Sequence, residues 1–106
     1  MAMDLNKLMK QAQEMQEQMA KAQEELKNET VEASAGGGMV TVKATGGLEI
    51  VEIKISPDAI DPDDPDLLAD MVLAAVNEAL RSAQSLVEAK LGSAMGGLQG
   101  LGLPGL

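Results

Sequence analysis

Residues 4–28 carry apolar side chains at alternating steps of three and four residues, with no Gly or Pro among them. This heptad spacing predicts one long helix of about 37 Å, with Asp4 as its N-cap. The apolar stripe is narrow, so it suits packing against another helix. Either the helix packs on its own domain alone, or it also meets its copy in a second chain, and the length of the helix favours the second alternative. The seam consists of Leu5, Leu8, Ala12, Met15, Met19, Ala22 and Leu26.

Residues 29–56 change to a period of two, which predicts strands rather than helix. Three apolar-alternating runs are separated by glycines at positions 36–38 and by the pair Gly46 and Gly47. Short turns between consecutive strands indicate an antiparallel meander, and the Gly pair predicts a two-residue hairpin turn. The alternation changes phase between Ile50 and Val51, which indicates a β-bulge at that point.

Residues 65–91 predict a second long helix, introduced by the capping residue Asp64 and by Pro65 at its first position. Its apolar stripe is wider than that of the first helix, so we expect it to cover the sheet. Gly92 is expected to end this helix and to begin a flexible, Gly-rich tail over residues 92–106. The predicted fold is a single α+β domain over residues 1–91: long N-terminal helix, three-stranded antiparallel meander, long C-terminal helix.

This element order leaves apolar surface without a cover. The three-stranded sheet has two faces but only one main covering helix, and the apolar seam of the first helix has no partner. A second chain can complete both surfaces, so we predict an intertwined homodimer with two-fold symmetry.

Composition removes most kinds of chemistry. The chain has no Cys, His, Phe, Tyr or Trp. It therefore lacks thiolate metal ligands, the commonest general base, and the aromatic rings that stack on single-stranded bases. Six aspartates lie at positions 58–70, and the spacing of Asp61, Asp63 and Asp66 distantly resembles a calcium loop. The segment lacks the glycine and the distal glutamate of such a loop, so a solvated helix entry is the preferred interpretation. We expect no enzyme, cofactor, metal or small-molecule substrate.

Charge is distributed unevenly along the chain. Eight basic and 17 acidic residues give a net charge of −9, which repels nucleic acid on average. Positive charge persists at the start of the first helix, in Lys7 and Lys10, and in the later part of the second, in Arg81 and Lys90. These positions form either a local basic surface or ordinary solvated sites, and spacing alone favours the latter. No targeting segment or membrane-length apolar run is visible, so we expect a cytoplasmic protein without a membrane partner.

The segments "NKLMKQAQEMQ" and "GMVTVKATGG", with the acidic "DPDD" and the following long helix, resemble the YbaB/EbfC family of bacterial nucleoid-associated proteins over essentially the whole chain. The resemblance implies a tweezer-like, intertwined homodimer that binds double-stranded DNA in the cytoplasm and nucleoid, with a nucleoid-organising or gene-regulatory role. Its helical arms are the implied DNA contacts, which places Lys7, Lys10, Arg81 and Lys90 at the DNA.

No element presents Arg or Asn in an obvious recognition pattern, so we expect largely sequence-independent binding. The alternative is an acidic dimeric scaffold that binds a protein partner, which the net charge, the Met-bearing seam and the Gly/Leu tail favour.

Overall fold

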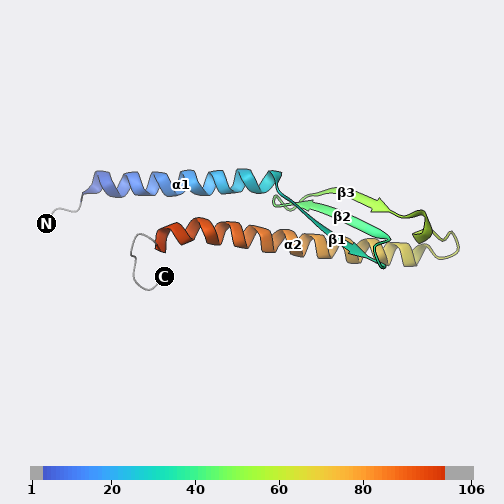
Figure 1. Cartoon of the computed structure of the whole chain (residues 1–106). Coiled ribbons are helices and arrows are strands. Elements are labelled where there is room, and N and C mark those ends of the chain that lie inside the picture. The colour runs from blue at the N-terminus through green and yellow to red at the C-terminus, as the bar shows by residue number, and fades with distance from the viewer. Residues whose placement is uncertain (1–3, 100–106) are drawn as a thin grey trace.

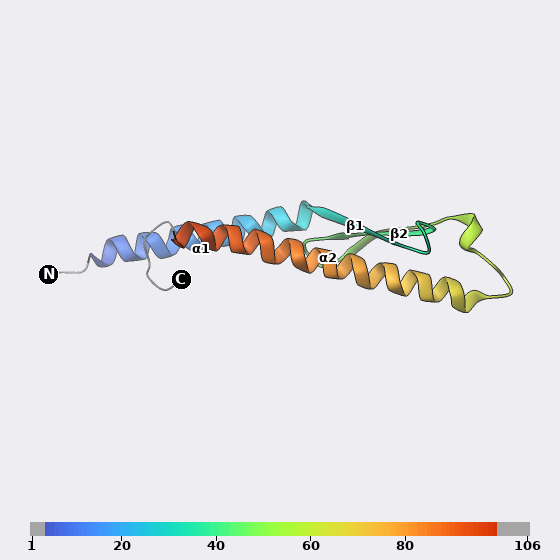
Figure 2. The same cartoon turned by 60° about the horizontal axis from the view of Figure 1, so that its bottom comes forward.

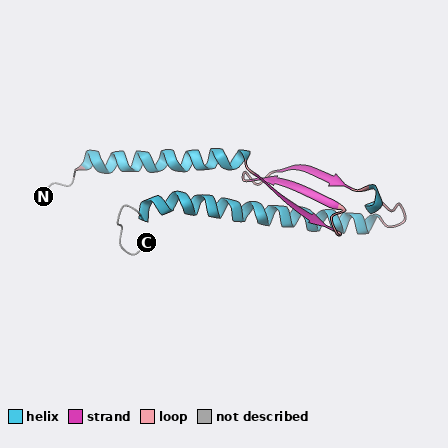
Figure 3. Ribbon diagram, viewed as in Figure 1, coloured by secondary structure: helices cyan, strands magenta, loops and turns pink. Residues whose placement is uncertain are grey.

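The computed structural model describes the backbone of residues 4–99 and the side chains of residues 4–94. Two long helices and a three-stranded sheet form an elongated molecule of 77 × 24 × 16 Å (Figures 1 and 3). The predicted α+β order of helix, meander and helix is confirmed. The elements are α1 (Leu5–Asn28), β1 (Thr30–Ala35), β2 (Val40–Thr45), β3 (Ile50–Ile55), the 3₁₀ helix η1 (Pro57–Ala59) and α2 (Pro65–Gln99).

The sheet is antiparallel, in the order β1-β2-β3, and has one apolar and one polar face. Val40 and Val42 of β2 are completely buried, whereas Thr41 and Lys43, which alternate with them, point to the opposite, polar face. On that face Glu52 of β3 forms ion pairs with Lys43 and Lys54, at 3.3 and 3.4 Å. This division is typical of an antiparallel sheet that has water on one side.

Helix α2 covers the apolar face and makes the core. Ala75, Ala79 and Ala83 recur every fourth residue along one stripe of the helix, and all three are completely buried. They pack against the valines of β2, and Ala44, Ala59 and Met71 complete the cluster of buried residues. Side chains this small let the helix axis approach the sheet closely. The helix lies over β1 and β2 and has little contact with β3 (Figure 2).

The bulge in β3 is confirmed, whereas the predicted hairpin turn before it is wrong. Lys43 pairs with Glu52 and Ala44 with Ile50, so Val51 is the extra residue. The loop between β2 and β3 contains three residues rather than two, because the Thr45 N–H donates to the Glu49 carbonyl at 2.9 Å. Its third residue, Leu48, has φ 62°, the left-handed position of a three-residue hairpin loop.

The predicted end of the second helix at Leu91 is also wrong, because α2 continues through Gly92 to Gln99. A glycine inside a helix costs only about 1 kcal/mol relative to alanine. Three glycines lie within residues 92–99, each with this modest cost, and no proline follows before Pro104. Residues 92–99 are therefore helical, and the rest of the predicted flexible tail lies outside the described residues.

Helix α1 runs antiparallel to α2 (Figure 1), and the two ends of its seam differ in burial. Ala22 and Leu26 are buried where the end of α1 packs against α2 and against the turn after β2. Leu5 and Leu8 are 68% and 43% exposed, on the part of α1 that extends past the end of α2. The end of the seam thus packs within the chain, at Ala22 and Leu26, and the exposed part remains the surface predicted to meet a copy of the helix.

An ion-pair cluster joins the two helices where they meet. The Lys90 ammonium of α2 lies 2.8 Å from the Glu25 carboxylate of α1 and 3.0 Å from that of Glu29. The hydrogen bond from Lys90 and its charge hold the pKa of the Glu25 carboxyl below its ordinary value of 4.5. The hydrogen bonds to Glu25 and Glu29 in turn raise the pKa of Lys90 above 10.5.

We expect this cluster to make stability depend on pH. Because the pKa of Glu25 is lowered on folding, its contribution is complete above about 4.5 and is lost as the pH falls through the lowered value. The Lys90→Met variant lacks that contribution. As the pH is lowered from about 5 to about 3, the free energy of unfolding of the variant should therefore fall less steeply than that of wild type. Urea unfolding at fixed chain concentration measures both slopes. Lys7→Met, which removes a lysine outside the cluster, should retain the wild-type slope. Identical slopes for wild type and Lys90→Met would contradict the assignment.

Gly46 allows the turn after β2 to approach α1. Its N–H donates to the Glu29 carbonyl at 3.0 Å, and a Cβ atom there would meet the Leu26 carbonyl oxygen and lie 2.8 Å from the Leu26 Cβ. Gly46→Ala should therefore lower the free energy of unfolding by about 1–3 kcal/mol. At Gly47 the nearest atom to such a Cβ is 3.4 Å away, so Gly47→Ala is the matched control and should be nearly neutral. Equal effects of the two substitutions in urea unfolding would refute the steric argument.

Candidate nucleic-acid interface

Lysines without a carboxylate partner gather on α1. Lys7 and Lys10 are exposed in its first two turns, and Lys21 lies further along. Among the side chains of residues 4–94, no carboxylate is within ion-pairing distance of these three lysines. The first turn of α1 contains no acidic residue, and the N-cap Asp4 accepts a hydrogen bond from the backbone N–H of Lys7.

The two basic residues predicted on α2 are both engaged by carboxylates. Arg81 donates from Nε and Nη2 to the Glu78 carboxylate, at 3.1 and 2.8 Å. Lys90 belongs to the cluster with Glu25 and Glu29, and its side chain is only 27% exposed. Since Glu25 lies 15 residues after Lys10, Lys90 is about 22 Å from Lys10 along α1. The structure therefore does not bring the four predicted residues together.

The remaining lysines are also paired. Lys27 lies 3.6 Å from Glu24, and Lys43 and Lys54 share Glu52. The unpaired lysines thus confine the candidate interface to α1. We name the first part of this helix, residues 5–13, the α1 tip, and Lys21 lies outside it. The α1 tip contains Lys7, Lys10 and several uncharged polar residues, and no acidic residue.

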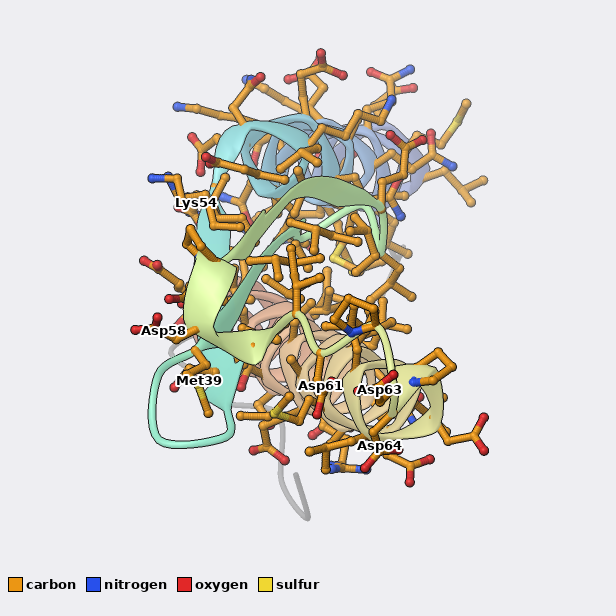
Figure 4. All side chains as sticks on the ribbon, turned by 90° about the vertical axis from the view of Figure 1, so that its right-hand side faces the viewer. Met39, Lys54, Asp58, Asp61, Asp63 and Asp64 are labelled. Atoms are coloured by element: carbon orange, nitrogen blue, oxygen red, sulfur yellow. The ribbon has the colours of Figure 1, made fainter. Side chains whose placement is uncertain are left out.

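Acidic residues occupy the opposite end of the molecule. Residues 57–70 contain six aspartates and no basic residue. Figure 4 views that end along the long axis and shows Asp58, Asp61, Asp63 and Asp64 around η1 and the start of α2. Asp61 and Asp64 accept hydrogen bonds from backbone N–H groups of Asp63 and Leu67, as expected for turn and cap residues. Within the described residues, no group of three or more acidic side chains is arranged to hold a metal ion.

The cluster around Lys90 had no local signal in the sequence. Its partner Glu29 lies 61 residues earlier, so no rule of helix spacing connects them. Arg81 and Glu78, by contrast, are three residues apart on one helix, a spacing at which opposite charges meet. That spacing could have shown in advance that Arg81 is neutralised.

Helices long and apolar enough to cross a membrane are absent from the part of the chain that the structure describes. In the crystal structure of an uncharacterized protein from Helicobacter pylori the same fold is found, with a TM-score of 0.72 at 22% identity, covering 89% of this chain and 98% of that one. The low identity limits this likeness to the fold.

Relatives in sequence are closer. A nucleoid-associated protein of Acetivibrio thermocellus is 57% identical over 103 residues, which cover 97% of this chain and 89% of the relative. A nucleoid-associated protein of Pelotomaculum thermopropionicum is 52% identical, covering 97% and 95%. The model of the YbaB/EbfC DNA-binding family matches residues 1–98. The chain therefore belongs to the YbaB/EbfC DNA-binding family.

Proposed function

We propose that this protein is a nucleoid-associated protein that binds duplex DNA as a homodimer through its two α1 tips, largely without regard to sequence. One observation carries the proposal. Of the eight basic side chains, all within residues 4–94, those without a carboxylate partner are Lys7, Lys10 and Lys21, and all three lie on α1. The names of the family and of the relatives support DNA as the ligand and the nucleoid as the location.

The net charge of −9 does not by itself prevent such contact, because six of the 17 acidic residues lie at the end of the molecule away from the α1 tip. The α1 tip and the six aspartates lie at opposite ends of a chain 77 Å long. Electrostatic interactions between exposed charges are screened over about 8 Å at physiological salt. A phosphate at Lys7 or Lys10 therefore interacts with the local lysines far more strongly than with the distant acidic end.

The α1 tip offers phosphate contacts rather than a reading of bases. Lysine acts as a point charge, whereas guanine recognition usually relies on the bidentate guanidinium of arginine. Arg81 is the single arginine of the sequence, and Glu78 engages it. Two duplexes of unrelated sequence should consequently bind with similar affinity.

The shape of the chain supports a dimer. Its radius of gyration is 20.7 Å. A compact domain of the same length has a radius of about 13 Å, so this chain buries little of its own surface. An extended subunit with a small core is typical of proteins that complete their fold in an oligomer.

Strand β3 supplies the surface that we assign to the second copy. Ile53 and Ile55 pair with Val42 and Val40, so they share the apolar face of the sheet. Because α2 covers β1 and β2, these two isoleucines remain 46% and 38% exposed. A row of apolar side chains on an edge strand is costly in water and is usually covered.

The DNA contact can be tested with Lys7→Gln/Lys10→Gln. Four lysines on two α1 tips give a slope of log affinity against log salt of about −4, and the variant should lose nearly all of this dependence. Fluorescence anisotropy with labelled duplex DNA across a salt series measures it. Affinity at about 0.1 M salt should fall at least tenfold, by a similar factor for each duplex sequence.

Lys27→Gln/Lys54→Gln is the matched control, since it changes the net charge equally but away from the α1 tip. It should bind DNA much as wild type does. Equal weakening by the two variants would show that total charge matters and not the α1 tip. Absence of binding by wild type at low salt would favour the acidic scaffold and its protein partner instead.

The dimer surface can be tested with Ile53→Lys. A charge in the β3 row should dissociate the dimer, so the mass in light scattering should fall from twice the 11.0 kDa of one chain to 11.0 kDa. Lys54→Glu also changes a charge on β3 but on the polar face, and it should leave the dimer intact. A dimeric Ile53→Lys variant would exclude this surface.

A further inference from the structure

An apolar groove lies between α1 and the later part of α2. It has a volume of about 430 Å³. Met15, at 39% exposure, and the half-buried Met19 contribute from α1, and Ala94 contributes from α2. The volume is within the range that protein pockets use for a ligand or a few side chains.

The described lining of this groove carries no charge. Beside the methionines and alanines it consists of glutamine side chains, although 24% of the chain is charged. Methionine side chains are flexible and polarizable, so such a surface adapts to an irregular apolar segment. The lining residues are Met15, Gln16, Gln18, Met19, Ala20, Gln23 and Ala94.

Residues 100–106 have the matching chemistry and begin next to the groove. Their sequence is "GLGLPGL", with three leucines, a proline and no charged side chain. Helix α2 ends at Gln99, five residues beyond Ala94, which is about 7.5 Å along the helix axis. Seven residues span up to about 24 Å when extended, so the segment can return to Ala94 and Met15.

We propose that residues 100–106 fold back and occupy the groove between α1 and α2 of their own chain. Gly100 directly follows the last helical residue, the position at which glycine allows a helix to end and the chain to reverse. Leu101 and Leu103 then cover the methyl groups of Met15 and Met19. The docked segment braces α1 against α2 just before the α1 tip, and so it holds Lys7 and Lys10 in position.

Tethering favours this occupant over a second copy or a separate protein. A segment attached next to its site is present at an effective concentration in the millimolar range, whereas another chain must reach the groove by diffusion. The neutral lining also offers nothing to attract a charged partner. The inference does not depend on DNA binding or on the β3 interface.

A spin label near the end of the chain tests the proposal in the full-length protein. The sequence has no cysteine, so Gly105→Cys gives a single labelling site. With methionine methyl groups labelled with ¹³C, the oxidised spin label should broaden the signals of Met15 and Met19 relative to the reduced label. Met39 and Met71, at the sheet end of the molecule, are internal controls and should stay sharp.

Docking is distinguished from mere proximity by Leu101→Ser/Leu103→Ser in the labelled chain. This change leaves the tether intact and should abolish most of the broadening, and it should shift the Met15 and Met19 signals. Equal broadening with and without the leucines would overturn the proposal.

A mixture identifies the chain that supplies the segment. Spin-labelled chains without ¹³C are combined with ¹³C-labelled chains without a spin label and are allowed to exchange. We expect sharp Met15 and Met19 signals in this mixture. Broadening there would assign the groove to the segment of a second copy and overturn docking within one chain. Sharp signals in every sample would leave the groove to a separate partner and would refute the proposal.

Discussion

The packing of the α2 alanines against the β2 valines is the contact on which the rest of the structure depends. Ala75, Ala79 and Ala83 meet Val40 and Val42, and all five are completely buried. A strand of six residues spans about 20 Å, whereas the 35 residues of α2 span about 52 Å. The sheet can therefore support less than half of the helix. The rest of α2 extends beyond the sheet, where it packs against α1. The long, narrow shape follows from this mismatch in length.

The same mismatch explains why apolar surface remains uncovered at two places. One helix cannot cover three strands, so Ile53 and Ile55 stay exposed beside α2. Two helices side by side, without a third layer, leave the methionines of α1 accessible along their junction. These surfaces differ in form, since one is a row on a strand and the other is a groove between helices. The proposed second copy would cover the strand, and the proposed docking of residues 100–106 would fill the groove.

The sequence predicted the elements well, because their signals are local. Heptad spacing, the change to a period of two and the phase slip at Ile50 each depend on neighbours within a few residues. The errors have physical causes too. Gly92 predicts a helix end, but glycine only lowers the stability of a helix and does not forbid the helical conformation. Leu48 occupies a left-handed backbone position that glycine usually fills. The sequence therefore predicts a two-residue turn at the Gly pair, whereas the loop has three residues.

Long-range contacts explain why the candidate site was predicted less well than the fold. In the sequence alone, the four predicted basic residues are equally good candidates for a DNA contact. Lys90 was neutralised by carboxylates of another helix, which only the packing of α1 against α2 brings near. Two of the seven seam residues, Ala22 and Leu26, are buried within the chain, and the close approach of Gly46 to Leu26 shows that the β2–β3 turn helps to cover them. Spacing described these residues correctly but could not identify their partners.

Carboxylates pair with most of the basic residues, and this pairing limits where the proposed DNA contact can form. A protein with free lysines over its whole surface would bind DNA in many orientations. Here Arg81, Lys90 and the lysines near the sheet are each matched by a carboxylate, and six aspartates repel phosphate at the far end. Attraction is thus confined to the unpaired lysines of α1, two of which lie in the α1 tip, and repulsion disfavours an approach within a screening length of the aspartates. The negative net charge repels DNA on average. In the proposed function it also orients the bound DNA, because it leaves the unpaired lysines of α1 as the attractive surface.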